Sequence, residues 1–232
     1  MKRKNAQAFL VIPARKAVGL TSVALGLVRT LQRLGVEAGF VKPIAEETPD
    51  RSGYFARQIF QMQVPEALLL QSAAERIAAN QTSELLEEIV GLCMKAGEAA
   101  DVLIIEGLHA DESHSFISQI NVDIARSLNA EVIVVADASL DSAFADLRFA
   151  IGQFLNSGCK VAGVVFNKAA EEFDGADAQR RLAALSENNE IVVAPDDAIL
   201  ATWQRERPAM LNDTRKLMAA SLLLLAPPVD GR

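Results

Sequence analysis

The residues best suited to chemistry lie in a short loop between an apolar run at residues 9–13 and an amphipathic segment that follows it. A phosphate-binding loop has a small residue, four residues of any kind, and then Gly-Lys-Ser/Thr. In this sequence Ala14, Gly19 and Thr21 match that spacing, while Leu20 stands at the lysine position. The unpaired N–H groups and the dipole of a helix N-terminus favour an anion at such a loop. The loop residues that we expect to contact this anion are Ala14, Arg15, Lys16, Val18, Gly19, Leu20, Thr21 and Ser22.

The missing lysine should weaken catalysis more than it weakens binding. One charge-assisted hydrogen bond contributes about 1.5–3 kcal/mol to binding. Loss of one donor to a transition-state oxyanion costs roughly a hundred- to a thousandfold in rate. We therefore expect weakened anion binding with poor phosphoryl transfer. A plain strand–turn–helix connection that binds no ligand stays the alternative.

Several of the apolar runs are followed directly by a polar residue, and these residues are Lys42, Glu106, Asp137 and Asn167. An acidic residue placed directly after a wholly apolar strand, such as Glu106, needs a partner or a site. Ligands of parallel sheets bind beyond the C-terminal ends of the strands. We therefore expect these residues near the loop. The alternatives are an ordinary strand-end lysine at Lys42 and a turn-capping amide at Asn167.

Apolar runs of strand length alternate along the chain with longer segments of helical period. Strands are predicted at residues 9–13, 38–41, 102–105, 131–136, 161–166 and 191–194. Helices are predicted at residues 20–34, 82–96, 116–128, 143–155 and 176–185, with weaker helical segments up to 79 and a C-terminal helix that ends near 225. Wholly apolar strands are buried on both faces, which indicates a parallel sheet. The sequence predicts one α/β domain over residues 1–232, with a doubly wound, mostly parallel sheet of about six or seven strands and helices on both faces.

Composition narrows the class of protein further. The net charge of −7 argues against a nucleic-acid binder, which needs a basic face. Cys93 and Cys159 form no CxxC pair and lie beside no histidine, so we expect neither a zinc site nor a disulfide. We expect His109 and His114 to be exposed loop residues. The longest apolar run, at residues 217–226, is too short for a membrane span, and together with the absence of a signal-peptide pattern this predicts a cytoplasmic protein.

The chain resembles a family, on the residues at 11–46, 80–90, 102–108, 120–137 and 161–168. Together these segments are similar to the N-terminal domain of long bacterial phosphate acetyltransferases, which is itself similar to dethiobiotin synthetase, a P-loop ligase. A leucine after the loop glycine is usual in the acetyltransferase family, so Leu20 follows the pattern. The sequence departs at Arg15 and Lys16, where the family tends to have a glycine and a small hydroxyl residue. If Arg15 replaces a glycine of positive φ, the loop must be reshaped.

The resemblance also implies roles for individual residues. Arg15 lies where some partner-switching P-loop ATPases keep a second lysine, so Arg15 and Lys16 either compensate for Leu20 or are solvent-facing cations. In the ligase, a lysine at the place of Lys42 reaches the substrate and the phosphates, and an asparagine at the place of Asn167 reads the adenine edge. Gly107 would permit close approach of a phosphate. The implied cofactors are ATP and Mg²⁺, weakly bound or absent, and the implied metal ligands are Thr21, Glu106 and Asp50.

Three functions remain open from the sequence. The first is a non-catalytic or regulatory nucleotide- or anion-binding domain. In the family, acyl transfer between acetyl-CoA and phosphate resides in a separate catalytic domain, and since the chain ends before such a domain would begin, we expect no acyl transfer from it alone. The second is an ATP-dependent ligase of the dethiobiotin synthetase type. The third is an interaction scaffold with an empty loop. The expected partners are a phosphate-bearing small molecule, a phosphate acetyltransferase catalytic domain and further copies of the chain.

Overall fold

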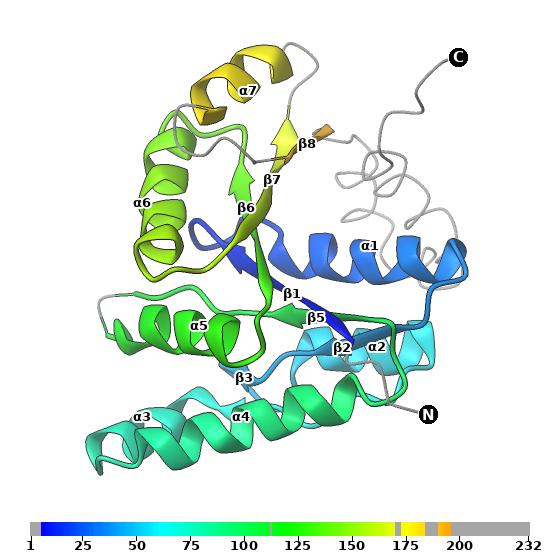
Figure 1. Cartoon of the computed structure of the whole chain (residues 1–232), viewed down its shortest axis with the longest axis vertical. Helices are drawn as coiled ribbons and strands as arrows, with labels where there is room; N and C mark the ends of the chain where they lie inside the picture. Colours follow the sequence, from blue (N-terminus) through cyan, green and yellow to red (C-terminus); the bar gives the residue numbers. More distant parts are fainter. Residues whose placement is uncertain (1–5, 112, 170–172, 184–189, 196–232) are drawn as a thin grey trace.

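A six-stranded parallel sheet forms the centre of the molecule, with the strand order β2-β5-β1-β6-β7-β8. The structure is a computed structural model that describes residues 6–111, 113–169, 173–183 and 190–195 (Figure 1). The strands are β1 (Gln7–Pro13), β2 (Ala38–Val41), β5 (Val102–Glu106), β6 (Glu131–Asp137), β7 (Val161–Ala169) and β8 (Glu190–Pro195). The strands β2 and β5, which come earlier in the sequence, lie on one side of β1, and the later strands β6, β7 and β8 lie on the other side. The end of β1 is therefore the topological switch point, where ligands of such sheets bind.

Helices cover both faces of the sheet (Figure 1). One face packs against α1 (Leu20–Arg33) and α2 (Arg51–Phe60). The other face packs against α3 (Leu70–Ala78), α4 (Thr82–Ala96), α5 (Phe116–Ser127), α6 (Ala143–Asn156) and α7 (Gly175–Ala183). Successive side chains of β1 point to opposite faces of the sheet: Leu10 and Ile12 belong to one core cluster, and Val11 belongs to the other. This burial on both sides is the reason that the strands are apolar throughout.

The predicted fold class is confirmed, and the differences are local. The strand predicted at 161–166 runs on to Ala169, which places Asn167 inside the sheet. A separate pair of two-residue parallel strands, β3 (Ile44–Ala45) and β4 (Leu68–Leu69), was not predicted, since runs this short carry no periodic signal. The predicted C-terminal helix lies outside the described residues, so a single domain over the whole chain stays a prediction.

Two further observations bear on the class of protein. Within the described ranges, every helix is too short or too polar to cross a bilayer. Cys93 and Cys159 both carry free thiols, and burial raises the pKa of Cys93 to about 12. A thiol with so high a pKa stays protonated and unreactive at neutral pH.

Candidate functional site

An open cleft of about 490 Å³ lies beyond the C-terminal ends of β1, β2 and β5. It is lined by all loop residues from 15 to 22 and by Lys42, Asp50, Glu106 and Gly107. The structure therefore brings together most of the residues that the sequence singled out. Ala14 and Asn167 do not line the cleft, because Ala14 continues the pairing of β1 with β6 and Asn167 lies behind the loop. The cleft is large enough for a phosphate group and its substituent.

The loop leads into α1 through residues with left-handed backbone conformations. Gly19 is the N-cap of α1, with φ 83° and ψ 28°, and no side chain in the described part of the chain caps the helix. The loop takes positive φ at Ala17 and Gly19 and not at Arg15, so Arg15 replaces no glycine that the backbone requires. The first N–H groups of a helix have no partner within it, and no acidic residue occupies the first turn of α1. The helix therefore presents its positive end to the cleft.

Two residues at the end of β7 hold the loop from behind. Asn167 Nδ2 donates a hydrogen bond to the carbonyl oxygen of Val18 at 2.8 Å. Lys168 Nζ donates to the carbonyl oxygen of Ala17 at 2.8 Å and forms an ion pair with Asp137 Oδ2 at 2.6 Å. Burial raises the pKa of Asp137, but the hydrogen bonds from Lys168 and Ser139 together outweigh burial, and the pKa lies below its ordinary value. The loop is thus shaped by the protein itself. A contact of Asn167 with adenine stays a prediction.

Replacing Lys168 with methionine should lower the free energy of unfolding by about 1–2 kcal/mol at neutral pH, since two partly exposed charge-assisted hydrogen bonds are lost. Asp137 has a lowered pKa in the folded state, so the stability that it contributes is lost as the pH falls through that pKa. The difference between wild type and Lys168→Met should therefore shrink below about pH 4. Urea unfolding at neutral and acidic pH measures both effects. An equal difference at both pH values would contradict the assigned ion pair.

A buried polar cluster lies beside the loop, centred on Glu106, which is 2% exposed. Its Oε1 atom accepts hydrogen bonds from Thr21 Oγ1 at 3.0 Å and Ser52 Oγ at 2.8 Å. Lys42 Nζ lies 3.3 Å from the same oxygen and 3.1 Å from Asp50 Oδ1. Sequence reasoning missed Ser52, since it follows a polar segment with no apolar run to mark it. The cluster joins elements that lie far apart in the sequence.

Glu106 and Lys42, which contact each other in this cluster, both have shifted pKa values. Burial raises the pKa of Glu106, and the nearby Lys42 and Ser52 oppose this only in part. Burial lowers the pKa of Lys42, but Glu106 and Asp50 outweigh it, so that the ammonium form is favoured. Among the described residues, Glu106 Oε2 is buried without any hydrogen-bond partner. Two carboxylates therefore share one ammonium group, and the cluster keeps one unsatisfied oxygen.

The resemblance implies a magnesium ion held by Thr21, Asp50 and Glu106, and the structure gathers these residues around Lys42. Magnesium lies about 2.0–2.1 Å from its oxygen ligands. Lys42 Nζ lies 3.1 Å from Asp50 Oδ1 and 3.3 Å from Glu106 Oε1, so a cation of the protein already contacts the two carboxylates that the resemblance assigns to the ion. The described part of the chain also holds no group of three or more His, Cys, Asp or Glu residues suited to a metal. In this arrangement the ammonium group contacts the same two carboxylates, and the magnesium site stays a prediction.

The two loop cations have acidic partners outside the loop. Lys16 Nζ forms an ion pair with Asp111 Oδ2 at 2.9 Å. Arg15 Nη1 donates to Ser142 Oγ at 3.1 Å and lies 3.9 Å from a carboxylate oxygen of Asp146. Both side chains are more than half exposed. They line the cleft and remain available to an anion at the cost of weak surface ion pairs.

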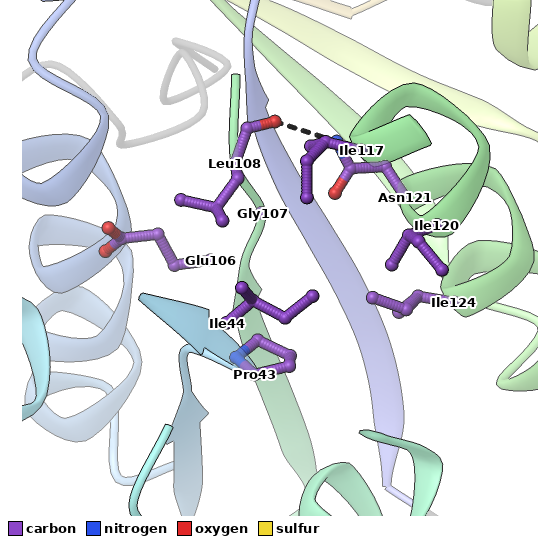
Figure 2. A pocket seen from close by; sticks show the side chains of 9 residues that line it. All are labelled: Pro43, Ile44, Glu106, Gly107, Leu108, Ile117, Ile120, Asn121 and Ile124. Atoms are coloured by element: carbon purple, nitrogen blue, oxygen red, sulfur yellow. Dashed lines mark hydrogen bonds between the residues drawn. The ribbon is translucent and has the colours of Figure 1, made fainter. Parts of the chain in front are cut away.

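Glycine at position 107 has a packing reason that the sequence did not reveal. A Cβ atom there would lie 2.9 Å from Asn121 Oδ1 and 3.0 Å from Ile12 Cγ2. Asn121 on α5 donates a hydrogen bond from Nδ2 to the carbonyl oxygen of Leu108 at 2.8 Å. Figure 2 shows this hydrogen bond beside a cavity of about 10 Å³, with the Glu106 carboxylate directed away from the isoleucines that line the cavity. Gly107 therefore allows α5 to pack closely, whether or not a phosphate approaches it.

A parallel sheet with an uncapped helix and a loop of phosphate-binding spacing after its central strand defines a P-loop α/β protein. Two solved structures agree with this fold. The MinC:MinD cell division protein complex of Aquifex aeolicus has a TM-score of 0.59 at 13% identity and covers 98% of both chains. The signal recognition particle 54 kDa protein of Aeropyrum pernix, solved in complex with GDP, has a TM-score of 0.54 at 16% identity and covers 83% of this chain and 42% of its own.

A protein-family model described as an AAA domain matches residues 7–200, and the chain belongs to that family. Phosphate acetyltransferase of Pseudomonas aeruginosa is 34% identical over 233 residues, which cover 93% of this chain and 33% of the relative. Phosphate acetyltransferase of Pseudomonas putida is 36% identical over 186 residues, which cover 76% of this chain and 27% of the relative. The resemblance found in the sequence is confirmed. The chain spans about a third or less of the length of these curated relatives.

Proposed function

We propose that this chain is a regulatory domain of the phosphate acetyltransferase type that binds a nucleotide or another phosphate-bearing ligand without converting it. The observation that carries the proposal is the uncapped N-terminus of α1, which faces an open cleft while Leu20 occupies the lysine position. The N–H groups of the loop supply affinity for an anion. ATP is the first candidate ligand.

The same geometry argues against turnover. Leu20 offers no donor to a phosphate oxygen, and its side chain packs against the core cluster under α1. Phosphoryl transfer relies on charge stabilisation of the transferred group, and the loop lysine is one of its main sources. Arg15 and Lys16 are cations in the same cleft, but neither stands at the lysine position of the loop, which Leu20 occupies. Binding therefore persists in the proposal, and catalysis does not.

Acyl transfer is proposed to belong to a part of the relatives other than the third that this chain matches. Among the described residues, neither Cys93 nor Cys159 lines the cleft, so neither thiol is placed to carry an acyl group there. An assay for acetyl phosphate with the 232-residue chain should therefore give no product. A proposed partner of the chain is a phosphate acetyltransferase catalytic domain.

The experiment that tests the proposal is a calorimetric titration of the full chain with ATP, ADP, GTP and CoA, followed by a measurement of nucleotide hydrolysis. Binding without hydrolysis is the expected result. ADP release that depends on 7,8-diaminopelargonic acid and bicarbonate would establish the ligase instead. If none of the four ligands binds or shifts the melting temperature, the interaction scaffold with an empty loop is the function that remains.

Replacing Leu20 with lysine should tighten ATP binding by about tenfold to a hundredfold, because a charge-assisted hydrogen bond to a phosphate is gained. The position lines the cleft, so the new ammonium group can reach the ligand. Leu20→Met is the matched control, since methionine is a long, unbranched side chain like lysine but carries no charge, and it should leave the affinity for ATP unchanged. Unchanged affinity in Leu20→Lys would show that the loop does not hold the phosphates.

A further inference from the structure

The resemblance implies that Lys42 reaches the ligand, but in the structure its ammonium group contacts two carboxylates. Lys42 lies between the end of β2 and Pro43, and its side chain is only 15% exposed. Its Nζ lies between Asp50 Oδ1 at 3.1 Å and Glu106 Oε1 at 3.3 Å. The lysine therefore points into the carboxylate pair and forms a buried contact with both members.

Each carboxylate is held in place by other contacts. Asp50 is the N-cap of α2, and its Oδ2 accepts a hydrogen bond from the backbone N–H of Gly53 at 2.6 Å. Glu106 is fixed by the hydroxyl groups of Thr21 and Ser52. Asp50 Oδ1 and Glu106 Oε1 both contact the Lys42 ammonium group, and carboxylate and hydroxyl oxygens are the ligands that hard divalent ions prefer. A protein cation already stands beside these oxygens.

The charges of Asp50, Glu106 and Lys42 also indicate that this cluster needs a cation. Asp50 and Glu106 together carry two negative charges, and Lys42 compensates for one of them. Both carboxylates are largely buried, and charges that are removed from water are costly without an opposite charge beside them. Among the described residues, Glu106 Oε2 is buried and has no hydrogen-bond donor, so the charge of this carboxylate depends on the contacts of Oε1. If the ammonium group were removed, the cluster would keep rigid oxygens, a double negative charge and free space.

We propose that the Lys42 ammonium group takes the place of a divalent metal ion in this cleft, so that the loop binds its anionic ligand without metal. The part of this inference that concerns the anionic ligand rests on the proposed function. The part that concerns Asp50 and Glu106 does not. It also goes against the magnesium site that the resemblance implies. Metal independence would make the ligand a free anion rather than a metal complex.

The first test uses the metal alone. Mn²⁺ prefers the same oxygen ligands as Mg²⁺ and can be counted by electron paramagnetic resonance. The full wild-type chain should bind no Mn²⁺ at the cleft, so that Glu106→Gln has the same Mn²⁺ binding as wild type. Wild-type binding of Mn²⁺ that Glu106→Gln abolishes would overturn the proposal.

The second test removes the built-in cation. Lys42→Met should gain Mn²⁺ affinity by about tenfold or more, because a buried charge-assisted contact is exchanged for a metal ligand set. The added Mn²⁺ should also raise the melting temperature of this variant and not that of wild type. Lys16→Met is the matched control, since it removes a lysine from an exposed lysine–aspartate pair of the same cleft, and it should gain nothing. A folded Lys42→Met chain that gains no affinity would overturn the proposal, and if this variant does not fold, the wild-type comparison still decides.

The third test separates this inference from the proposed function. ATP is titrated against wild type in the presence of EDTA and in the presence of Mg²⁺. Equal affinity in both supports the inference, and binding that needs Mg²⁺ overturns it. If ATP binds in neither condition, the proposed function fails while the Mn²⁺ measurements still decide the state of the carboxylate pair.

Discussion

Replacing Lys42 with alanine should lower the free energy of unfolding by about 3–5 kcal/mol at neutral pH, the cost of removing one partner from a buried ion pair. Glu106 is almost fully buried, and Lys42 is its main source of positive charge. Without the ammonium group, the described residues place no other cation beside Asp50 and Glu106, and the Thr21 and Ser52 hydroxyl groups remain as donors to Glu106. Chemical unfolding monitored by circular dichroism measures the loss.

The stability of Lys42→Ala should also depend on pH in a defined direction. Burial already raises the pKa of Glu106, and loss of Lys42 should raise it further. A carboxyl group whose pKa is raised by folding destabilises the protein as the pH rises through that pKa. Lys42→Ala should therefore recover stability in acid. The double variant Lys42→Ala with Glu106→Gln should be more stable than Lys42→Ala at neutral pH and lose this pH dependence. A double variant as unstable as the single one would contradict the assigned pair.

Replacing Gly19 with alanine should abolish ligand binding and destabilise the protein by about 1–3 kcal/mol, the cost of a left-handed conformation in a residue with a side chain. Gly19 has φ 83°, and a Cβ atom built there would lie 2.3 Å from Asn167 Nδ2. Either the loop or the Asn167 side chain must move, and the hydrogen bond from Asn167 to Val18 would be disturbed. The loop would then no longer present its N–H groups to the cleft.

A matched control separates backbone strain from the clash. Gly35, just after α1, has φ 76°, and a Cβ atom placed on it would meet no atom of the described residues within 4 Å, so Gly35→Ala carries the conformational cost alone. Calorimetry with ATP and thermal unfolding of both variants should show a shared loss of stability, with loss of binding only in Gly19→Ala. Retained ATP binding in Gly19→Ala would show that the ligand lies elsewhere.

The strand ends of the site were predictable because their signal is local. A run such as residues 131–136 is apolar at every position, which requires burial on both faces and so a parallel sheet with helices around it. Parallel strands end at one edge, and this is why the sequence alone predicts Lys42 and Glu106 near the loop. The spacing of Ala14, Gly19 and Thr21 likewise lies within one short segment.

The contacts between these residues were not predictable, since they depend on pairings between distant parts of the chain. The sequence does not state that β5 lies between β2 and β1, and this order is what places Glu106 next to Lys42. Ser52 and Lys168 join the site through α2 and β7, and neither carries a local mark. The reason for Gly107 is a helix that packs against it from the other face.

The amino-acid order alone was enough for the α/β class, the loop with its missing lysine and the edge of the sheet where polar residues gather. The position of Lys42 between two carboxylates, and the hold of Asn167 and Lys168 on the loop, came only with the folded arrangement. The physical reason is range: hydrophobic burial and loop spacing act on neighbours in sequence, whereas the energy of a buried charge depends on whichever groups the fold brings within about 4 Å of it.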